Sequence, residues 1–290
     1  MTLKERLKSN KFTYLIITKI RRVQYFILPV LLPNIISIII FNIKRFLRIM
    51  GISRKGRYEK LKELKNKHTG ERCFIVATGP SLTINDLEKL DHEFTFSMNS
   101  ICLAFQETDW RPTYYGIQDI GVFNKFEKYI EELDVECKFI SDFISKQKPI
   151  PDDSFIYPHH LLNHTIPHPK YRTKFSDDAF AVVYDGYSIT YSLIQIAVYL
   201  GFKEIYLLGA DCNYASNMNH HFKEYGIVDP TFLSAGDRMI SAYLEAKKYA
   251  EKNNIKIFNA TRGGKLEVFE RVNLDEVLSK NSRLLEVKTV

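Results

Sequence analysis

The stretch that most constrains this chain is an apolar run, at residues 73–81, that breaks into a Gly-Pro-Ser turn. A polar segment that favours a helix follows, with Asn85, Asp86 and Glu88. A buried strand, a tight turn and a helix in this order are how an open α/β sheet builds a phosphate or nucleotide site. The same residues could equally form a corner that binds nothing, because Gly-Pro-Ser matches neither the dinucleotide fingerprint nor the Walker lysine motif.

The turn residues each suit a ligand. Gly79 lets a ligand approach the backbone closely, and Pro80 fixes the turn. Ser81 is expected to cap the following helix or to bond a phosphate, and the helix N-terminus would add free N–H groups and a positive field.

The basic residues are concentrated at the start of the chain. The formal net charge is +7, yet residues 1–58 contain a single acidic residue, Glu5, beside roughly 13 Lys and Arg residues. The remainder is net acidic, so no nucleic-acid partner is expected. The four cysteines lack metal-ligand or redox spacing, and buried thiols in the cytosol are expected for Cys73, Cys102, Cys137 and Cys212.

Residues 1–58 are predicted to form a basic, apolar, membrane-associating helical segment. Residues 24–43 carry no formal charge and have about the length of a membrane span, but Pro29, Pro33, Asn34 and Ser37 argue against a straight helix. Flanking Lys and Arg residues favour a peripheral or monotopic position on the cytoplasmic membrane. The alternative is a helix pair that covers the core or forms a homo-oligomer interface.

The remaining residues predict an α/β fold. We expect a linker helix at 59–69, a Rossmann-like nucleotide-binding catalytic domain at 70–280 and a tail at 281–290. The sheet is expected to be open and mostly parallel, with helices on both faces, as a GT-A-like variant. Expected strands lie at residues 73–78, 93–99, 112–119, 136–140, 204–209 and 256–259, with helices at 122–133, 185–201 and 233–253 and a short strand and helix within 268–278.

Polar pairs end two of these strands. Asn99-Ser100 follows the second strand and Gln118-Asp119 follows the third. Ligands bind at the carboxyl edge of a parallel sheet, so these two ends and the Gly-Pro-Ser turn after the first strand together predict a site better than any one of them. Each pair is also compatible with simple turn chemistry.

Two later stretches add candidate reactive groups. Asp211, just past a buried strand, is a candidate base, metal ligand or sugar-hydroxyl acceptor, or else an Asx turn. His220 and His221 in the next loop suit general acid–base work, or are solvated loop residues. The irregular, proline-rich residues 145–180 are expected to form a variable loop over the substrate site rather than a metal site, despite His159, His160, His164 and His168.

Four motifs together resemble a known family. These are Thr-Gly-Pro-Ser-Leu at 78–82, Met-Asn-Ser at 98–100, Leu-Gly-Phe-Lys-Glu-Ile-Tyr-Leu-Leu-Gly-Ala-Asp at 200–211 and Asn-Ala-Thr-Arg-Gly-Gly-Lys-Leu-Glu-Val-Phe at 259–269. They resemble the DUF115 or MptE-like family, often met in surface-polysaccharide gene clusters, over roughly residues 70–275. The plan is also similar to the bacterial sialyltransferases of glycosyltransferase family 42, and the archaeal relatives include a 6-hydroxymethyl-dihydropterin pyrophosphokinase.

The resemblance implies roles residue by residue. Thr78 stands where the sialyltransferases have an Asn. Gly79-Pro80-Ser81 match their motif, and Asn99 matches their next nucleotide-binding Asn. Gln118 stands in place of a third Asn. The helix start that holds the nucleotide phosphate is similar to Gly186 and the stretch Tyr187-Ser188-Ile189-Thr190. The catalytic histidine corresponds to His221, with His220 in reserve, and Tyr214 and Tyr225 stand for the paired phosphate-binding tyrosines.

Together these features predict a metal-independent glycosyltransferase that needs no cofactor. It would use a nucleotide sugar, CMP-activated by resemblance, and a glycan or lipid-linked acceptor of bacterial surface polysaccharide. Ser100 and Asp119 would join the nucleotide site, and Asp211 would orient the sugar or His221. The alternatives are an Mg²⁺-dependent pyrophosphokinase with Asp119 and Asp211 as metal ligands, or a non-catalytic nucleotide-binding protein of an assembly complex.

Overall fold

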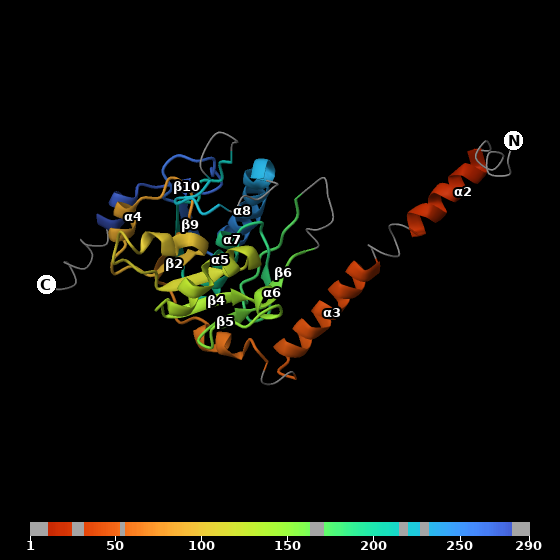
Figure 1. Ribbon diagram of the computed structural model, residues 1–290, viewed down its shortest axis with the longest axis horizontal. Helices are drawn as coiled ribbons and strands as arrows, with labels where there is room; N and C mark the ends of the chain where they lie inside the picture. Colours follow the sequence, from red (N-terminus) through yellow and green to blue (C-terminus); the bar gives the residue numbers. More distant parts are fainter. Residues whose placement is uncertain are drawn as a thin grey trace. The chain divides into compact units, whose positions relative to one another are not determined.

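The computed structural model describes residues 11–24, 32–52, 56–162, 171–214, 220–226 and 232–279. By its internal contacts the chain divides into two compact units, residues 1–54 and residues 55–290. Each unit is described by itself (Figure 1).

The first unit contains two helices, α2 (Lys11–Arg22) and α3 (Leu32–Ile49). Pro33 was expected to interrupt a helix, but it lies in the first turn of α3, where its missing N–H group has no intrahelical partner to lose. The predictions for Pro29 and for residues 1–10 and 25–31 fall outside the described residues. No helix in the described ranges is long and apolar enough to cross a bilayer.

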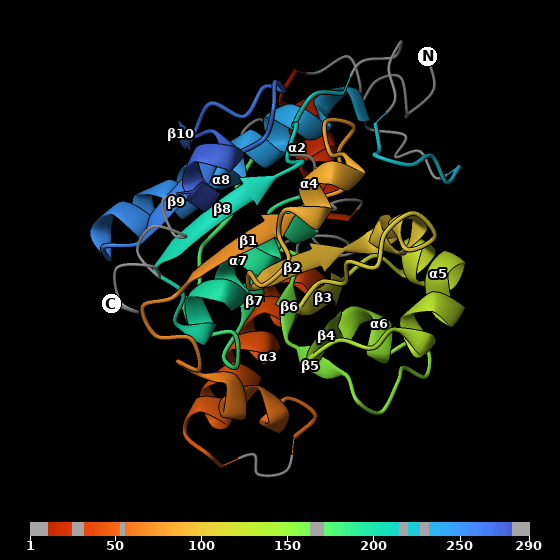
Figure 2. The same ribbon diagram turned by 90° about the vertical axis from the view of Figure 1, so that its left-hand side faces the viewer.

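The second unit is built on an eight-stranded sheet in which every pairing is parallel, in the order β10-β9-β8-β1-β2-β3-β4-β5 (Figure 2). The α/β Rossmann-like prediction is therefore confirmed. The strands are β1 (Arg72–Val76), β2 (Thr95–Met98), β3 (Tyr114–Ile117), β4 (Cys137–Ser141), β5 (Phe155–Tyr157), β8 (Glu204–Leu208), β9 (Lys256–Asn259) and β10 (Glu270–Arg271).

Alternation along each strand builds two cores. Cys73 and Ile75 of β1 point to one face, and Phe74 and Val76 point to the other. On the first face pack η2 (Glu59–Leu64), α7 (Ile189–Leu200) and α8 (Ala235–Lys252). On the second pack α4 (Ile84–Glu88), η3 (Asn99–Ala104), α5 (Ile120–Glu132) and α6 (Asp142–Ser145). All four cysteines are buried thiols, as expected.

Sequence patterning missed part of the sheet. Residues 145–180 were expected to be irregular, yet they supply β5 and also β6 (His159–His160), which pairs with β7 (Val183–Tyr184) in a separate two-stranded sheet. These strands are two or three residues long, too short for alternation to register. The segment expected as a linker places Leu61 and Leu64 of η2 in the core. The expected strand and helix near 268–278 appear as β10 and a helix at 274–279.

The strand order reverses direction beside β1. From β1 the chain adds β2, β3, β4 and β5 on one side, and it then returns to place β8, β9 and β10 on the other. The loops that leave β1 and β8 therefore diverge over opposite faces, which opens a crevice at the carboxyl ends of these two strands. This topological switch point is where the candidate site lies.

Candidate functional site

A cleft of about 610 Å³ opens at this switch point. It is bounded by the loops after β1, β2, β3 and β8, the first turns of α7 and α8, and the segment 220–226. The structure brings most of the predicted site residues to its lining, namely Thr78, Gly79, Pro80, Asn99, Gln118, Asp119, Ser188, Thr190, Asp211, Tyr214, His220, His221 and Tyr225. Ser81, Ser100 and Gly186 do not line it.

The loops after β1 and β8 touch at the floor of the cleft. A Cβ atom on Gly79 would lie 2.2 Å from Asp211 Oδ2 and 2.4 Å from the Gly209 carbonyl oxygen, so only glycine fits. Ser81 Oγ donates to Asp211 Oδ2 at 2.8 Å, and the Ser81 N–H donates to it at 3.3 Å. Burial raises the pKa of the Asp211 carboxyl, and the Ser81 hydrogen bonds oppose that rise. Asp211 therefore holds the β1 turn in shape.

Three predicted residues act outside the cleft lining. Ser81 does not cap the helix, because Thr83 is the N-cap of α4 and forms a capping box with Asp86. Ser100 is buried within η3. Gly186 packs against the ring of Tyr191, where an added Cβ would lie 2.3 Å from ring atoms. These residues shape the loops.

Asn99 lines the cleft and contains a buried side-chain acceptor without a hydrogen-bond partner among the described residues. Its backbone is left-handed, with φ of +49°, and its carbonyl oxygen accepts a hydrogen bond from the Tyr115 hydroxyl at 2.8 Å. The side-chain Oδ1 atom is buried and has no hydrogen-bond partner among the described residues. A buried polar atom without a hydrogen-bond partner is costly to the folded state.

The polar pair after β3 is already engaged. Gln118 Nε2 donates to Asp185 at 3.3 Å, and its Oε1 accepts from Ser192 Oγ at 2.7 Å. Asp119 is the N-cap of α5, where its carboxylate accepts the Val122 N–H at 2.8 Å. Both residues line the cleft, but polar atoms of both already form hydrogen bonds within the protein.

The first turn of α7 faces the cleft. Ser188 is its N-cap and accepts the Thr190 N–H at 3.2 Å, as predicted. Thr190 is buried and donates to the sulfur of Met98 at 3.3 Å, so its hydroxyl is used within the protein. Helix N-termini attract anions, because their first N–H groups lack intrahelical acceptors.

Residues of α8 were missed by sequence reasoning. Arg238, in the second turn of α8, lines the cleft with its guanidinium 5.7 Å from the ring centre of Tyr187. Met239 and Tyr243 complete this wall. The signal was available, because the helix that follows a parallel strand begins at the ligand edge of the sheet. Arg238 adds positive charge where a phosphate or carboxylate would lie.

The two candidate histidines lie in one segment tied to β1. The Phe222 N–H donates to the Thr78 carbonyl oxygen at 2.8 Å. His221 lies beside Tyr225, with ring centres 4.6 Å apart, and His220 lies 5.4 Å from Tyr214. Burial, followed by the charges of Asp119 and Glu224, raises the pKa of Tyr225 to about 12, so its hydroxyl stays protonated at neutral pH.

The basic turn after β9 does not reach the cleft. Arg262 donates to Asp86 Oδ1 at 2.6 Å and to the Ser81 carbonyl oxygen at 3.0 Å. Burial alone would raise the pKa of Asp86, but hydrogen bonds from Arg262 and Thr83 lower it below its ordinary value. Arg262 therefore braces the β1 turn and compensates a buried carboxylate.

Arg262→Met is expected to reduce the free energy of unfolding by about 2 kcal/mol at pH 7, because it leaves the buried Asp86 carboxylate without its cation. The loss is moderate because the Arg262 side chain is half-exposed. Because the pKa of Asp86 is lowered in the folded state, its ion pair stabilises the fold fully at pH values above the ordinary pKa of an aspartate. This stabilisation is lost as the pH falls through the native pKa. The difference between the variant and the wild type should therefore shrink as the pH falls through the native pKa of Asp86. Urea titrations at pH 7 and at the lowest pH at which both proteins fold measure this, and an equal loss at each pH would contradict the assignment.

The histidines of residues 145–180 do not form a metal site in the described ranges, where no group of three or more His, Cys, Asp or Glu side chains could hold a metal. His159 is buried and His160 accepts the Leu162 N–H at 3.0 Å. The predictions on His164 and His168 fall outside the described residues.

The chain matches one family model and is similar to a solved structure. A family model described as "6-hydroxymethylpterin diphosphokinase MptE-like" matches residues 49–217. No curated protein matches the chain. A solved structure, the MAf glycosyltransferase from Magnetospirillum magneticum AMB-1, is similar with a TM-score of 0.47 and 16% sequence identity. The match covers 78% of this chain but only 38% of that enzyme.

Proposed function

The chain belongs to the MptE-like family, and from that premise we propose that its cleft binds a nucleotide-activated sugar and transfers the sugar to an acceptor hydroxyl. The single observation that carries the proposal is the histidine segment fastened to the end of β1. The hydrogen bond from Phe222 to Thr78 holds an acid–base group beside the turn that would receive the nucleotide.

The nucleotide would lie across the ends of β1 and β2. The Gly79-Pro80 turn and Asn99 line the cleft there, and the nucleotide would lie against them. The donor phosphate would lie at the first turn of α7, near Ser188, with Arg238 of the neighbouring helix α8 over the ring of Tyr187. The N–H groups and the guanidinium would stabilise the charge that develops on the departing phosphate. A CMP-activated donor is proposed by resemblance to the sialyltransferases.

The transfer step requires a base. His221 would take the proton from the acceptor hydroxyl as its oxygen bonds to the anomeric carbon, and the bond from that carbon to the phosphate oxygen would break. The electron pair of that bond leaves with the nucleotide. Asp211 would orient the β1 turn and, through it, the sugar. No metal is proposed for this step.

A diphosphokinase is the second candidate, favoured by the description of the family. It would transfer diphosphate from ATP with Mg²⁺, and Asp119 and Asp211 would be the carboxylates in reach. Both carboxylates already accept protein hydrogen bonds, as a helix cap and as the partner of Ser81. That engagement favours the sugar transferase. A nucleotide-binding protein without turnover is the remaining alternative.

Phosphorus NMR of the full chain separates these candidates. The protein is incubated with CMP-, UDP- and GDP-activated sugars in EDTA, and separately with ATP, Mg²⁺ and a hydroxymethylpterin. Release of CMP, UDP or GDP supports the transferase and identifies the donor class. Formation of AMP only in the second mixture would replace it by the diphosphokinase, and ligand-induced chemical shifts without product would support a binding protein.

We also propose that residues 1–54 bind the surface of an anionic membrane and hold the catalytic unit near a lipid-linked acceptor. Helix α3 exposes a run of large apolar side chains at helical spacing, Ile35, Ile36, Ile39, Ile40, Ile43 and Phe46. Lys44, Arg45 and Arg48 adjoin this run. Apolar burial in the interface and attraction to anionic headgroups would act together.

Ile40→Ser is expected to weaken binding of the full chain to vesicles of one-third phosphatidylglycerol in phosphatidylcholine about tenfold, the cost of one buried aliphatic side chain. Cosedimentation measures the effect. Leu244→Ser, which removes a comparably exposed leucine from α8, should leave binding unchanged. Equal binding of the wild type to vesicles without phosphatidylglycerol would contradict the electrostatic part of the proposal.

A further inference from the structure

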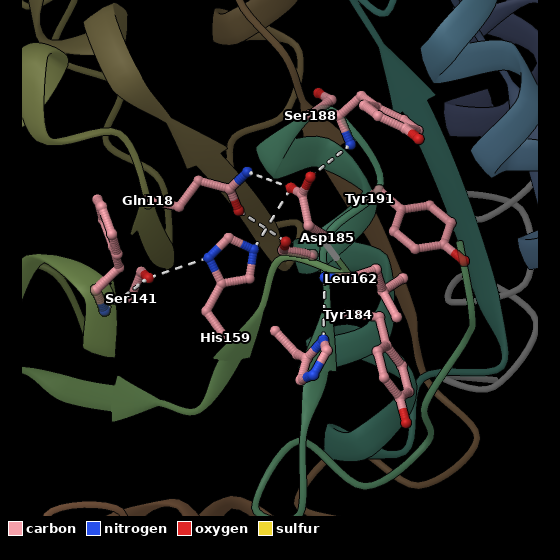
Figure 3. Close-up of polar contacts among 12 residues, drawn as sticks. Gln118, Ser141, His159, Leu162, Tyr184, Asp185, Ser188 and Tyr191 are labelled. Carbon is pink, nitrogen blue, oxygen red and sulfur yellow. Dashed lines mark hydrogen bonds and ion pairs between the residues drawn. The ribbon is translucent and has the colours of Figure 1, made fainter. Parts of the chain in front are cut away.

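A second polar cluster lies beside the donor cleft, beyond Gln118 (Figure 3). Its buried members are Ser141 at the end of β4, His159 in β6 and Asp185 after β7. Ser141 Oγ lies 3.2 Å from His159 Nδ1, and His159 Nε2 lies 3.4 Å from Asp185 Oδ1. The same Asp185 oxygen accepts the Gln118 amide at 3.3 Å.

The order Ser, His, Asp is that of a hydrolase triad, but the burial of the serine rules out that chemistry. Ser141 has no exposed surface, and its Oγ atom is the N-cap of α6, where it accepts the Phe143 N–H at 3.2 Å. A nucleophile must reach its substrate. The cluster therefore acts within the protein, on the residues that adjoin it.

Asp185 contacts both walls of the cleft. Its Oδ1 atom holds Gln118 on the β3 side, and its Oδ2 atom accepts the Tyr187 N–H at 3.3 Å on the α7 side. Tyr187 is in the left-handed region, with φ of +64°, a conformation that a bulky residue adopts only when its surroundings impose it. The next residue, Ser188, is the N-cap of α7.

The strained turn carries the residues proposed to meet the phosphate. Tyr187 lines the cleft and lies under the Arg238 guanidinium, and Ser188 begins the helix whose N–H groups face the ligand. The Gln118 amide is fixed in turn by Ser192 Oγ, which donates to its Oε1 atom at 2.7 Å. One buried carboxylate thus sets the position of groups on both sides of the site.

We propose that Asp185, which lies beside His159, is the positioning residue of the donor cleft: it fixes the Gln118 amide and the Tyr187 turn that presents α7 to the nucleotide phosphate. The effect on ligand binding rests on the proposed function. The positioning of the turn is independent of the proposed function, because it follows from the contacts of the unliganded protein.

The test compares two buried carboxylates in the full chain. Asp185→Asn keeps the side-chain volume but removes the charge that the Gln118 amide and the Tyr187 N–H share. Asp142→Asn is the matched control, since Asp142 is equally buried and bonds the His159 N–H at 3.2 Å, but it lies away from the cleft lining. His159→Gln is a milder second variant in case Asp185→Asn fails to fold.

Hydrogen–deuterium exchange gives the first readout. In Asp185→Asn the amides of residues 187–191 should exchange about tenfold faster than in the wild type, whereas in Asp142→Asn they should not change. His159→Gln should give a smaller increase in the same amides. Unchanged exchange there in both Asp185→Asn and His159→Gln would overturn the positioning role.

Binding of CMP, UDP, GDP and ADP gives the second readout. The dissociation constant of whichever nucleotide the wild type binds should rise about tenfold in Asp185→Asn and stay within about twofold in Asp142→Asn. Equal weakening in both variants would show a general loss of stability and would overturn the proposal. If the wild type binds none of the four, the proposed function fails, and the exchange data alone decide the positioning role.

Discussion

His221→Asn is expected to lower nucleotide-sugar turnover by about two to four orders of magnitude, the contribution of a positioned general base. Nucleotide affinity should stay within about twofold, because the proton transfer occurs only in the reaction and the binding groups lie on other elements. The segment itself should remain in place, since its link to β1 runs through the Phe222 backbone rather than through the imidazole.

Two histidine variants make this test specific. His92→Asn changes a histidine whose side chain is 93% exposed and which does not line the cleft, and it should leave turnover unchanged. His220→Asn should reduce turnover less than His221→Asn. If His220→Asn alone abolishes turnover, the base is His220, and if neither variant loses activity the acid–base role of this segment is wrong.

Gly79→Ala is expected to have the largest effect on the cleft itself. The new methyl group would overlap Asp211 Oδ2 and the Gly209 carbonyl oxygen, so the loops after β1 and β8 must separate. We expect the free energy of unfolding to fall by about 3 kcal/mol, the upper part of the range for overpacking. Nucleotide binding should be lost, because the same movement displaces the turn.

Gly56→Ala is the matched glycine control. Among the described residues no atom lies within 4 Å of the Cβ position at Gly56, and its φ is not in the left-handed region. Its stability should stay within about 0.5 kcal/mol of the wild type. Urea unfolding and nucleotide titration measure both variants. Normal nucleotide binding by Gly79→Ala would show that the β1 turn is not the ligand site.

The sheet was predictable because its central strands carry strong local signals. The run into Gly79 and the run into Asp211 are continuous apolar segments that end in turn residues, as strands buried on both faces do. The helix at 189–200 has its N-cap serine and a C-terminal Gly201 with φ of +99°. The short strands β5 and β6 were missed because two or three residues show no period.

The position of the candidate cleft was predictable from the sequence, but the role of each residue in it was not. Polar strand ends gather at one edge of a parallel sheet whatever their partners, so Asn99, Asp119 and Asp211 could be placed together. Which of them is free for a ligand depends on contacts between distant loops. The Ser81–Asp211 bond spans 130 residues and the Gln118–Asp185 bond spans 67, and no local pattern encodes either.

Arg238 is a cleft residue that the sequence alone did not identify. Its sequence context reads as the charged face of an amphipathic helix, and only the strand order places the start of α8 over the cleft. Arg262 is the reverse case, a residue that the sequence suggested as a ligand-binding group and that the structure places outside the cleft lining. Its turn resembles a phosphate-binding turn, but the Arg262 guanidinium compensates the buried Asp86.

The most direct test of the central claim is a thermal-shift measurement on the full chain with CMP, UDP, GDP and ATP in the presence of EDTA. A nucleotide at 100 times its dissociation constant should stabilise the folded state by about 2.7 kcal/mol, which raises the Tm by about 5 to 10 °C for a unit of this size. We predict that at least one pyrimidine or guanine nucleotide gives this shift without metal. A shift from ATP alone, and only when Mg²⁺ replaces EDTA, would contradict the sugar-transferase account.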